Sequence, residues 1–391
     1  MLKAFRYRMY PNKTQEVLLN KTFGCCRFFW NKQVETFLSY NKETNPTLKF
    51  KTSTELRNEV GFLREVSAGA LQQKEIDFKE FKSQYFSKTR KKAINKPKFK
   101  SKYDKQSYRL PNKKFSLHDD RIRLEKIGKV KIVQDRLLPE GYKLMSCTVS
   151  KDSLNHFYVS ILVETNIQHL PKTNKSIGID VGIKEFATLS DGTVINNPQY
   201  FRKSQAELKR SQQHLSRKKK GSNRYRKQKL KVAKVYKKVY RQRELFLHTT
   251  SLSIVKNYDV ISIETLNVSG MLKNRKLSKS IVDASWSTFF NQLKYKCEWY
   301  GKELVQVGRW EPTSKTCSTC GHINKELTLK VREWECPKCH THHERDLNAA
   351  INIQALGVSS AQRTQRECKT PLAEQPPVEV YKATVELSTT A

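Results

Sequence analysis

The chain has 391 residues, with 75 Lys or Arg against 37 Asp or Glu, a formal net charge of +38 and a pI of about 9.9. This length suits more than one domain, at roughly 100–200 residues each, and excludes a minimal binding module. The excess positive charge opposes compaction and predicts a polyanionic partner, with nucleic acid favoured over an anionic membrane surface.

Membrane and export classes have little support in the sequence. No apolar run approaches the roughly 20 residues that span a bilayer, and the basic, alternating start does not fit an export signal. We therefore expect a cytoplasmic protein. In that compartment the nine cysteines are expected to be metal ligands or core residues rather than disulfides.

The N-terminal part shows a strand pattern followed by a helical one. Residues 1–10 alternate basic and apolar side chains, and apolar residues recur at helical spacing from Pro11, with a helical region expected to about residue 95. Residues 82–115 hold thirteen basic residues and one acidic residue. This stretch suits a phosphate backbone, with rings for stacking on unpaired bases, although a solvated surface run is the alternative. The interleaved rings are those of Phe86, Phe99, Tyr103, Tyr108 and Phe115.

Residues 106–164 contain short segments in which apolar and polar side chains alternate, and turn residues separate these segments. This pattern predicts a small barrel, which the opening strand is expected to join. Residues 166–176, with Pro171, read as a linker into the next domain.

The segment from Ser176 to Thr193 predicts two strands, and the next is helical and basic. Eighteen Lys or Arg lie between Arg202 and Arg243 against one acidic residue, with a break at 221–223, which predicts a helical hairpin with a charged outer face. A buried strand ending at Glu264, a helix with an aromatic stripe and a further strand follow.

Two Cys-x-x-Cys pairs separated by fifteen residues predict a tetrahedral zinc site. Four thiolates leave no open coordination position, so the zinc is expected to be structural. His340, His342 and His343 are interpreted as surface or nucleic-acid contacts, with metal ligation as the alternative. The expected ligands are Cys317, Cys320, Cys336 and Cys339.

Three acidic residues stand out by their positions. Asp180 lies within an apolar strand, Glu264 ends another, and Asp346 opens an otherwise apolar helical stretch beyond the zinc segment. A buried charge is costly unless it binds something, and Mg²⁺ prefers oxygen ligands. Taken singly, each residue also fits a helix cap or a loop carboxylate. Together they predict a metal-dependent centre for phosphodiester hydrolysis.

These residues resemble the TnpB proteins of bacterial insertion sequences, relatives of the compact type V CRISPR effectors. The matching motifs are Gly-Ile-Asp-Val-Gly-Ile-Lys-Glu-Phe-Ala at 178–187, Ile-Glu-Thr-Leu-Asn at 263–267, and the four-cysteine segment running into Arg-Asp-Leu-Asn-Ala-Ala-Ile-Asn-Ile at 345–353. The basic segment that begins at Leu215 is also similar to a family segment. The resemblance extends over nearly everything before residue 360.

The resemblance implies an α/β fold with an RNase H-like (RuvC) nuclease core, a zinc-ribbon insert, an N-terminal helical recognition domain and a wedge-like β-barrel. Asp180, Glu264 and Asp346 would form the catalytic triad and bind Mg²⁺. Nucleic-acid contacts are expected at Arg217, Lys218, Lys219, Lys220 and Arg224. The implied boundaries are 1–10 with 104–170 for the barrel, 11–103 for the recognition domain, 171–310 with 342–360 for the nuclease, 311–341 for the zinc insert and 361–391 for a disordered tail.

The implied function is RNA-guided cleavage of double-stranded DNA next to a short adjacent motif, with a guide RNA from the transposon end. Such a protein would associate with the bacterial nucleoid. Two departures from the family pattern, Glu344 and Leu347, flank Asp346 and leave the triad complete. The alternatives are a nuclease-silent RNA-guided DNA binder and a transposase that acts directly on transposon ends.

Overall fold

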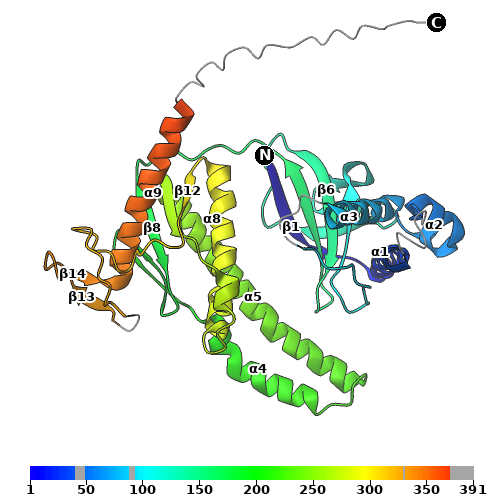
Figure 1. Cartoon of the computed structure of the whole chain (residues 1–391). Coiled ribbons are helices and arrows are strands. Elements are labelled where there is room, and N and C mark those ends of the chain that lie inside the picture. The colour runs from blue at the N-terminus through cyan, green and yellow to red at the C-terminus, as the bar shows by residue number, and fades with distance from the viewer. Residues whose placement is uncertain (40–48, 88–92, 329–330, 370–391) are drawn as a thin grey trace, which may run out of the picture. The chain divides into compact units, whose positions relative to one another are not determined.

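A computed structural model describes residues 1–39, 49–87, 93–328 and 331–369 and shows a mixed α/β protein. Its contacts divide the chain into two compact units, each taken by itself below. The first is Met1–Gln168 with Gln205–Lys238, and the second is His169–Ser204 with the chain from Val239 on (Figure 1). Among the described residues, no helix is both long enough and apolar enough to cross a bilayer.

The first unit contains a seven-stranded antiparallel sheet in the order β2-β6-β7-β1-β5-β4-β3. The opening strand β1 pairs with β5 and β7, which confirms that it joins the later strands. The strands are β1 (Leu2–Tyr10), β2 (Gln106–Pro111), β3 (Phe115–His118), β4 (Arg121–Leu124), β5 (Gly128–Val133), β6 (Lys143–Lys151) and β7 (Phe157–Glu164).

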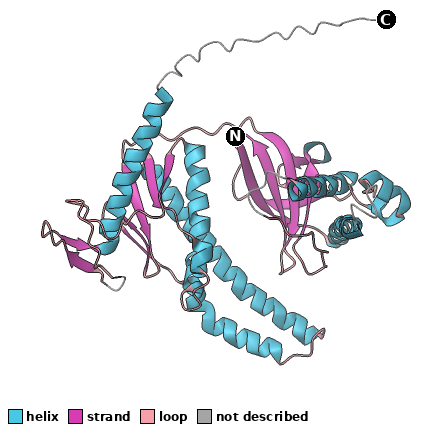
Figure 2. Ribbon diagram, in the orientation of Figure 1, coloured by secondary structure: helices cyan, strands magenta, loops and turns pink. Residues whose placement is uncertain are grey.

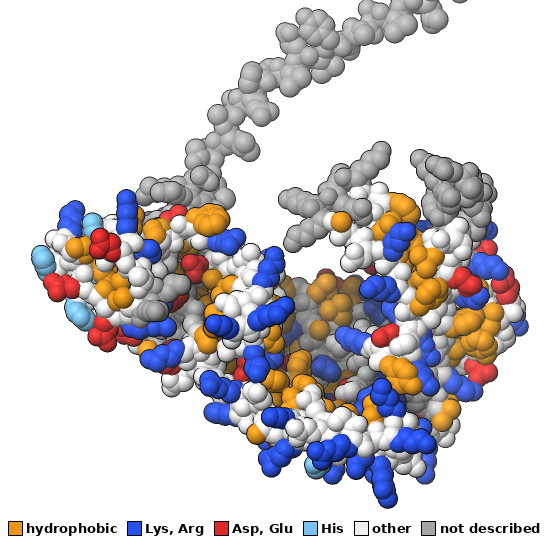
Figure 3. All heavy atoms as spheres, turned by 60° about the horizontal axis from the view of Figure 1, so that its bottom comes forward, with side chains coloured by type: hydrophobic (Ala, Val, Ile, Leu, Met, Phe, Trp, Pro, Cys, Tyr) orange, Lys and Arg blue, Asp and Glu red, His pale blue; other side chains and the backbone are white. Residues whose placement is uncertain are grey.

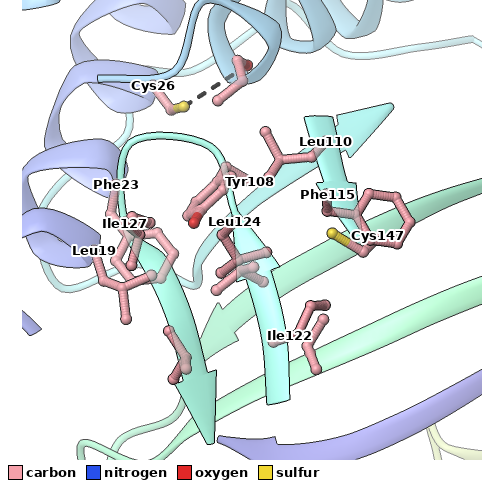
Figure 4. Packing of buried hydrophobic residues seen from close by; sticks show 14 of the residues in the cluster. Leu19, Phe23, Cys26, Tyr108, Leu110, Phe115, Ile122, Leu124, Ile127 and Cys147 are labelled. Atoms are coloured by element: carbon pink, nitrogen blue, oxygen red, sulfur yellow. Dashed lines mark hydrogen bonds between the residues drawn. The ribbon is translucent and has the colours of Figure 1, made fainter. Parts of the chain in front are cut away.

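One hydrophobic core joins this sheet to its neighbouring helices (Figure 4). Alternate residues of β7 are buried, as the period of two in a strand requires, and Leu19 and Phe23 of the first helix pack against the same cluster. The helices are α1 (Lys13–Ser39), α2 (Ser53–Glu59) and α3 (Ala68–Phe86), with the short turns η1 (Gly61–Glu65) and η2 (Asn112–Lys114).

Two of the five rings expected to stack on bases lie in this core instead. Tyr108 and Phe115 are only 1% and 7% exposed, because they occupy inward positions of β2 and β3. The outward Phe86, Phe99 and Tyr103 remain exposed. The expected helical region to residue 95 is also too long, because α3 ends at Phe86; residues 88–92 lie outside the described part of the chain.

The second unit is built on a five-stranded sheet in the order β10-β9-β8-β11-β12 (Figure 2). β8, β11 and β12 run parallel to one another, whereas β9 and β10 are antiparallel to their neighbours. The strands are β8 (Ser176–Val181), β9 (Glu185–Leu189), β10 (Val194–Asn196), β11 (Val260–Glu264) and β12 (Glu303–Val307).

The two faces of this sheet are covered by different helices. Ile177, Ile179, Ile261 and Ile263 pack in a cluster with residues of α5 and α8. The alternate positions face α9. The helices that follow β10 along the chain are α4 (Tyr200–Ser216), α5 (Asn223–Asn257), α6 (Val268–Met271), α7 (Ser278–Ala284), α8 (Trp286–Tyr300) and α9 (Arg345–Lys369). Residues 205–238 of α4 and α5 group with the first unit.

Gly178 permits α9 to lie directly on β8. A Cβ atom at this position would overlap the backbone oxygen of Ala350 and the backbone nitrogen of Gln354. Gly178→Ala should therefore destabilise the protein by at least about 2 kcal/mol, because the overlapping atoms belong to backbone and cannot rotate away. Urea unfolding measures the loss. Gly192→Ala is the control, because Gly192 lies at a turn with positive φ and has open space where a Cβ would lie, so that this substitution changes the backbone preference without causing overlap. An equal loss of unfolding free energy in both variants would contradict close packing as the cause.

Three domain boundaries differ from those expected. Residues 205–238 group with the first unit rather than with the nuclease segment. The strand β14 (His342–Glu344) pairs with β13 (Glu333–Glu335), so the zinc segment continues past 341. The helix α9 runs to Lys369, so the expected disordered tail cannot begin at 361; residues 370–391 lie outside the described part of the chain.

Candidate functional site

Two of the three predicted carboxylates lie at the carboxyl ends of neighbouring parallel strands. β8 and β11 pair with Ile179 opposite Ile263, so the next residues, Asp180 and Glu264, take adjacent positions. Both side chains belong to the face that α9 covers, because side chains alternate along a strand. The third carboxylate, Asp346, lies in the first turn of α9. The sheet and its covering helix thus bring three sequence-distant acids to one edge of the second unit.

The three carboxyl groups interact electrostatically. Burial, together with the charges of Asp346 and Glu264, raises the pKa of Asp180 to about 7, and Arg345 opposes this rise. Burial also raises the pKa of Glu264. Ionising all three carboxyl groups at once is costly, because their negative charges repel one another. A hard divalent cation bound between them would stabilise the ionised forms. The donor set therefore fits Mg²⁺.

Asp346 also contacts two arginines that the sequence did not single out as partners. Arg332 Nη1 donates to both carboxylate oxygens, at 3.0 and 3.2 Å, and Arg345 Nε lies 3.5 Å from Oδ1. In the described part of the chain, only the four cysteines bring three or more ligand atoms within 4.8 Å of one another. The carboxylates are therefore neighbours with a shared electrostatic environment, less tightly gathered than the sulfurs.

The four cysteines form a compact cluster. Their Sγ atoms all lie within 4.8 Å of one another, with Cys317 and Cys339 at 3.6 Å and Cys320 and Cys336 at 3.6 Å. Each Cys-x-x-Cys pair ends in a turn with a left-handed residue, Gly321 (φ 72°) and His340 (φ 55°). The backbone N–H of that residue donates to the carbonyl of the first cysteine of its pair. This geometry suits a metal ion that is coordinated tetrahedrally by four thiolates.

The three histidines of this segment have different environments. His343 is only 6% exposed, its ring packs against that of Trp334 at a tilt of 38°, and its Nε2 lies 3.0 Å from Cys317 Sγ. The interpretation of His343 as a surface contact was therefore wrong, because the pairing of β13 with β14 turns it inward. His340 and His342 are exposed, and His340 pairs with Glu335.

Two asparagines connect the cysteine cluster to the helix that carries Asp346. Asn348, 1% exposed, accepts from the backbone N–H of Ser318 and donates to the carbonyl of Thr316. Asn352 donates to the carbonyls of Thr313 and Thr316. These amide hydrogen bonds fix the position of the loop relative to α9. The signal for this role in the sequence is weak, namely two asparagines at helical spacing after Asp346.

The five basic residues predicted to contact nucleic acid lie at the tip of a helical hairpin. Gln212 Nε2 donates to Tyr236 Oη, and Gln228 Nε2 donates to the carbonyl of Ser211, which holds α4 beside α5. Lys and Arg side chains gather along this hairpin (Figure 3). The exposed residues at its tip are Arg217, Lys218, Lys219, Lys220 and Arg224.

Three family profiles match separate parts of the chain. The first is described as "Probable transposase" and matches residues 158–275. The second is described as "Cas12f1-like, TNB domain" and matches residues 286–353, which contain the cysteine cluster. The third is described as "Helix-turn-helix domain" and matches residues 1–44, where the described part holds β1 and one uninterrupted helix, α1.

Two bacterial relatives match nearly the full chain. A Streptomyces pristinaespiralis protein named "Putative RNA-guided DNA endonuclease" is 38% identical over 93% of both chains. An Escherichia coli K12 protein with the same description is 30% identical over 91% of this chain and 92% of its own. A solved structure, a Cas12f1 protein in complex with sgRNA and target DNA, superposes with a TM-score of 0.50 at 14% identity and covers 90% of this chain and 98% of its own. That likeness concerns the fold alone.

Proposed function

The chain belongs to the TnpB family of insertion-sequence proteins, and on that premise we propose that it is an RNA-guided endonuclease that cleaves target DNA. Support comes from the near full-length similarity to relatives named as such endonucleases in Streptomyces pristinaespiralis and Escherichia coli. The guide RNA would supply the sequence recognition, and the protein would read a short motif beside the target. Such a protein would work on cytoplasmic, nucleoid DNA.

The chemistry is assigned to the second unit, as an RNase H-like, RuvC-type nuclease. The observation that carries this assignment is the convergence of Asp180, Glu264 and Asp346, whose shared charges help to raise the pKa of Asp180. These three carboxylates would hold Mg²⁺. When bound there, the metal would activate water for attack on the phosphodiester and stabilise the leaving oxygen. The buried strands β8 and β11 fix two of the carboxylates, which keeps their orientation constant as DNA enters.

The cysteine cluster is assigned a structural role. Four thiolates would hold Zn²⁺ with no position left for water or substrate. Asn348 and Asn352 bond the cysteine loop to α9, so the ion would also stabilise the position of Asp346. Residues 11–103 are proposed as the recognition domain, and residues 1–10 with 104–170 as a separate wedge-like barrel.

Guide and target are assigned to the basic surfaces. The hairpin tip offers five exposed cations without an acidic neighbour between them, which suits a phosphate backbone. Binding through these residues should weaken steeply as salt rises, because each neutralised phosphate releases counterions.

A plasmid cleavage assay tests the proposal. Protein purified with its own RNA should linearise a plasmid that carries the matching target within a library of adjacent motifs, in Mg²⁺ and not in EDTA. Plasmid without the target, and protein without RNA, should stay uncut. Tight guided binding with no nicking would indicate a silent DNA binder instead. Joining of transposon ends without RNA would indicate a transposase.

A further inference from the structure

An exposed cation and ring follow the third parallel strand of the second unit. β12 ends at Val307, and the loop beyond it presents Arg309 and Trp310. The Trp310 side chain is 85% exposed, and the Arg309 guanidinium lies over its ring, 4.8 Å from the centroid. Single exposed rings are common on protein surfaces. This one differs because it lies at the carboxyl edge of the sheet, where open α/β sheets bind ligands.

A pocket of about 380 Å³ lies at this edge and reaches the candidate catalytic centre. Glu264 and Arg309 both line it. The side chains of Leu266 and Met271 form apolar parts of its wall, and Asn267 contributes an amide. A nucleobase has this combination of apolar face and polar edge. The pocket therefore has the chemistry of a nucleotide subsite that adjoins one of the three carboxylates.

Hydrogen bonds hold the two ends of the pocket together. Both the backbone N–H and the hydroxyl of Thr265 donate to the carbonyl of Val307, at 3.2 and 2.8 Å. These bonds join the residue after Glu264 to the last residue of β12. The loop that carries Arg309 is thus fixed relative to the carboxylate, as a residue that positions substrate needs to be.

The paired side chains fit an unpaired strand better than a duplex. A guanidinium binds phosphate through its fork of N–H donors, and an indole offers a flat face for stacking. A base inside a duplex is already stacked and paired, so only a base from a displaced or opened strand presents its face freely. Stacking of this kind tolerates any base, which a guided nuclease requires at its cutting centre.

We propose that Arg309, Trp310 and the adjoining pocket form a subsite that holds one nucleotide of single-stranded DNA next to the phosphate to be cut. This inference rests on the proposed function. Trp310 is a positioning residue, which acts on the reaction by fixing the strand. Its removal should therefore change the rate and the place of cutting, while guided binding of the target remains.

The test compares Trp310→Ala and Trp310→Phe in the full protein with its RNA. Trp310→Ala should cut a matched target at least about tenfold more slowly and at scattered positions, because one stacking contact is lost. Trp310→Phe should restore both the rate and the cut positions. Target binding and thermal melting should match those of the unaltered protein in both variants, since the side chain is exposed.

Photocrosslinking supplies a second readout that does not need cleavage. In the Asp180→Ala complex, a target strand that carries 5-iododeoxyuridine across the cutting region should crosslink to the peptide containing Trp310. Unchanged rate and cut positions in Trp310→Ala would overturn the inference, with or without a crosslink. If the unaltered complex does not cut at all, the proposed nuclease fails, and the crosslink alone decides whether single-stranded DNA occupies this subsite.

Discussion

Asp180→Ala should reduce guided DNA cleavage by at least about 1,000-fold, because losing one of the three carboxylates proposed to hold Mg²⁺ would cost several kcal/mol of transition-state stabilisation. The side chain lies beside Glu264 and near Asp346, and no other acid in the described β8 can replace it. Single-turnover cleavage of a matched target measures the loss. Binding of guide RNA and target should persist, because the basic surfaces are unchanged.

An aspartate elsewhere in the same sheet region serves as the control for Asp180, because it tests whether the position of the carboxylate matters for cleavage. Asp191 follows β9 at the other end of the β8–β9 pair, where it accepts a hydrogen bond from Tyr258. Asp191→Asn should cut at nearly the normal rate. Equal loss in both variants, or full activity in Asp180→Ala, would contradict the assignment of the centre.

The pH dependence of stability separates lost chemistry from lost folding. Because the folded pKa of Asp180 is raised to about 7, above an unfolded value of about 3.9, the ionised carboxylate destabilises the fold as pH rises through 7. Without added divalent metal, Asp180→Asn should therefore melt at a higher temperature than the unaltered protein at pH 8. The difference should vanish below about pH 4, where the carboxyl is protonated in both states.

Cys336→Ser should abolish binding of the proposed zinc ion and destabilise the second unit by several kcal/mol, because the binding energy of a closed zinc site is also folding energy. Cys336 is fully buried, and its sulfur lies 3.6 Å from that of Cys320. The loss should extend to cleavage, since the cysteine loop is bonded to α9 through Asn348. Metal analysis and thermal melting measure the first two effects.

Cys297→Ala is the control for the loss of a buried sulfur elsewhere. Cys297 lies in α8 within the core of the second unit, away from the cysteine cluster. Its replacement should lower the melting temperature while the zinc content stays at one ion per chain. A Cys336→Ser protein with full zinc content and unchanged melting would refute the four-thiolate site.

The strands that carry the site were predictable from the sequence, because β8 and β11 are short apolar runs that each hold one acid near their end. Their register was not predictable, since strand pairing is decided by contacts far apart along the chain. The cysteine spacing predicted the cluster for a local reason, namely that each Cys-x-x-Cys pair forms its own turn.

The sequence-based predictions were wrong where a high content of basic residues obscured the two-residue alternation of a β-strand. In residues 106–115 the basic side chains suggested a binding surface, yet Tyr108 and Phe115 follow the alternation of strands and are buried. The inward direction of His343 was not predictable, because it is set by a short two-stranded pairing in which each strand has three residues. The sequence signal for Arg309 and Trp310 is their position just after a third parallel strand.

The most direct test of the central claim is anomalous diffraction from Mn²⁺, a substitute for Mg²⁺, in crystals of the protein with guide RNA and target DNA. The account predicts metal density within about 2.5 Å of carboxylate oxygens from Asp180, Glu264 and Asp346, at the carboxyl edge of β8 and β11. Metal bound elsewhere, with these oxygens turned away from one another and from the scissile phosphate, would contradict it.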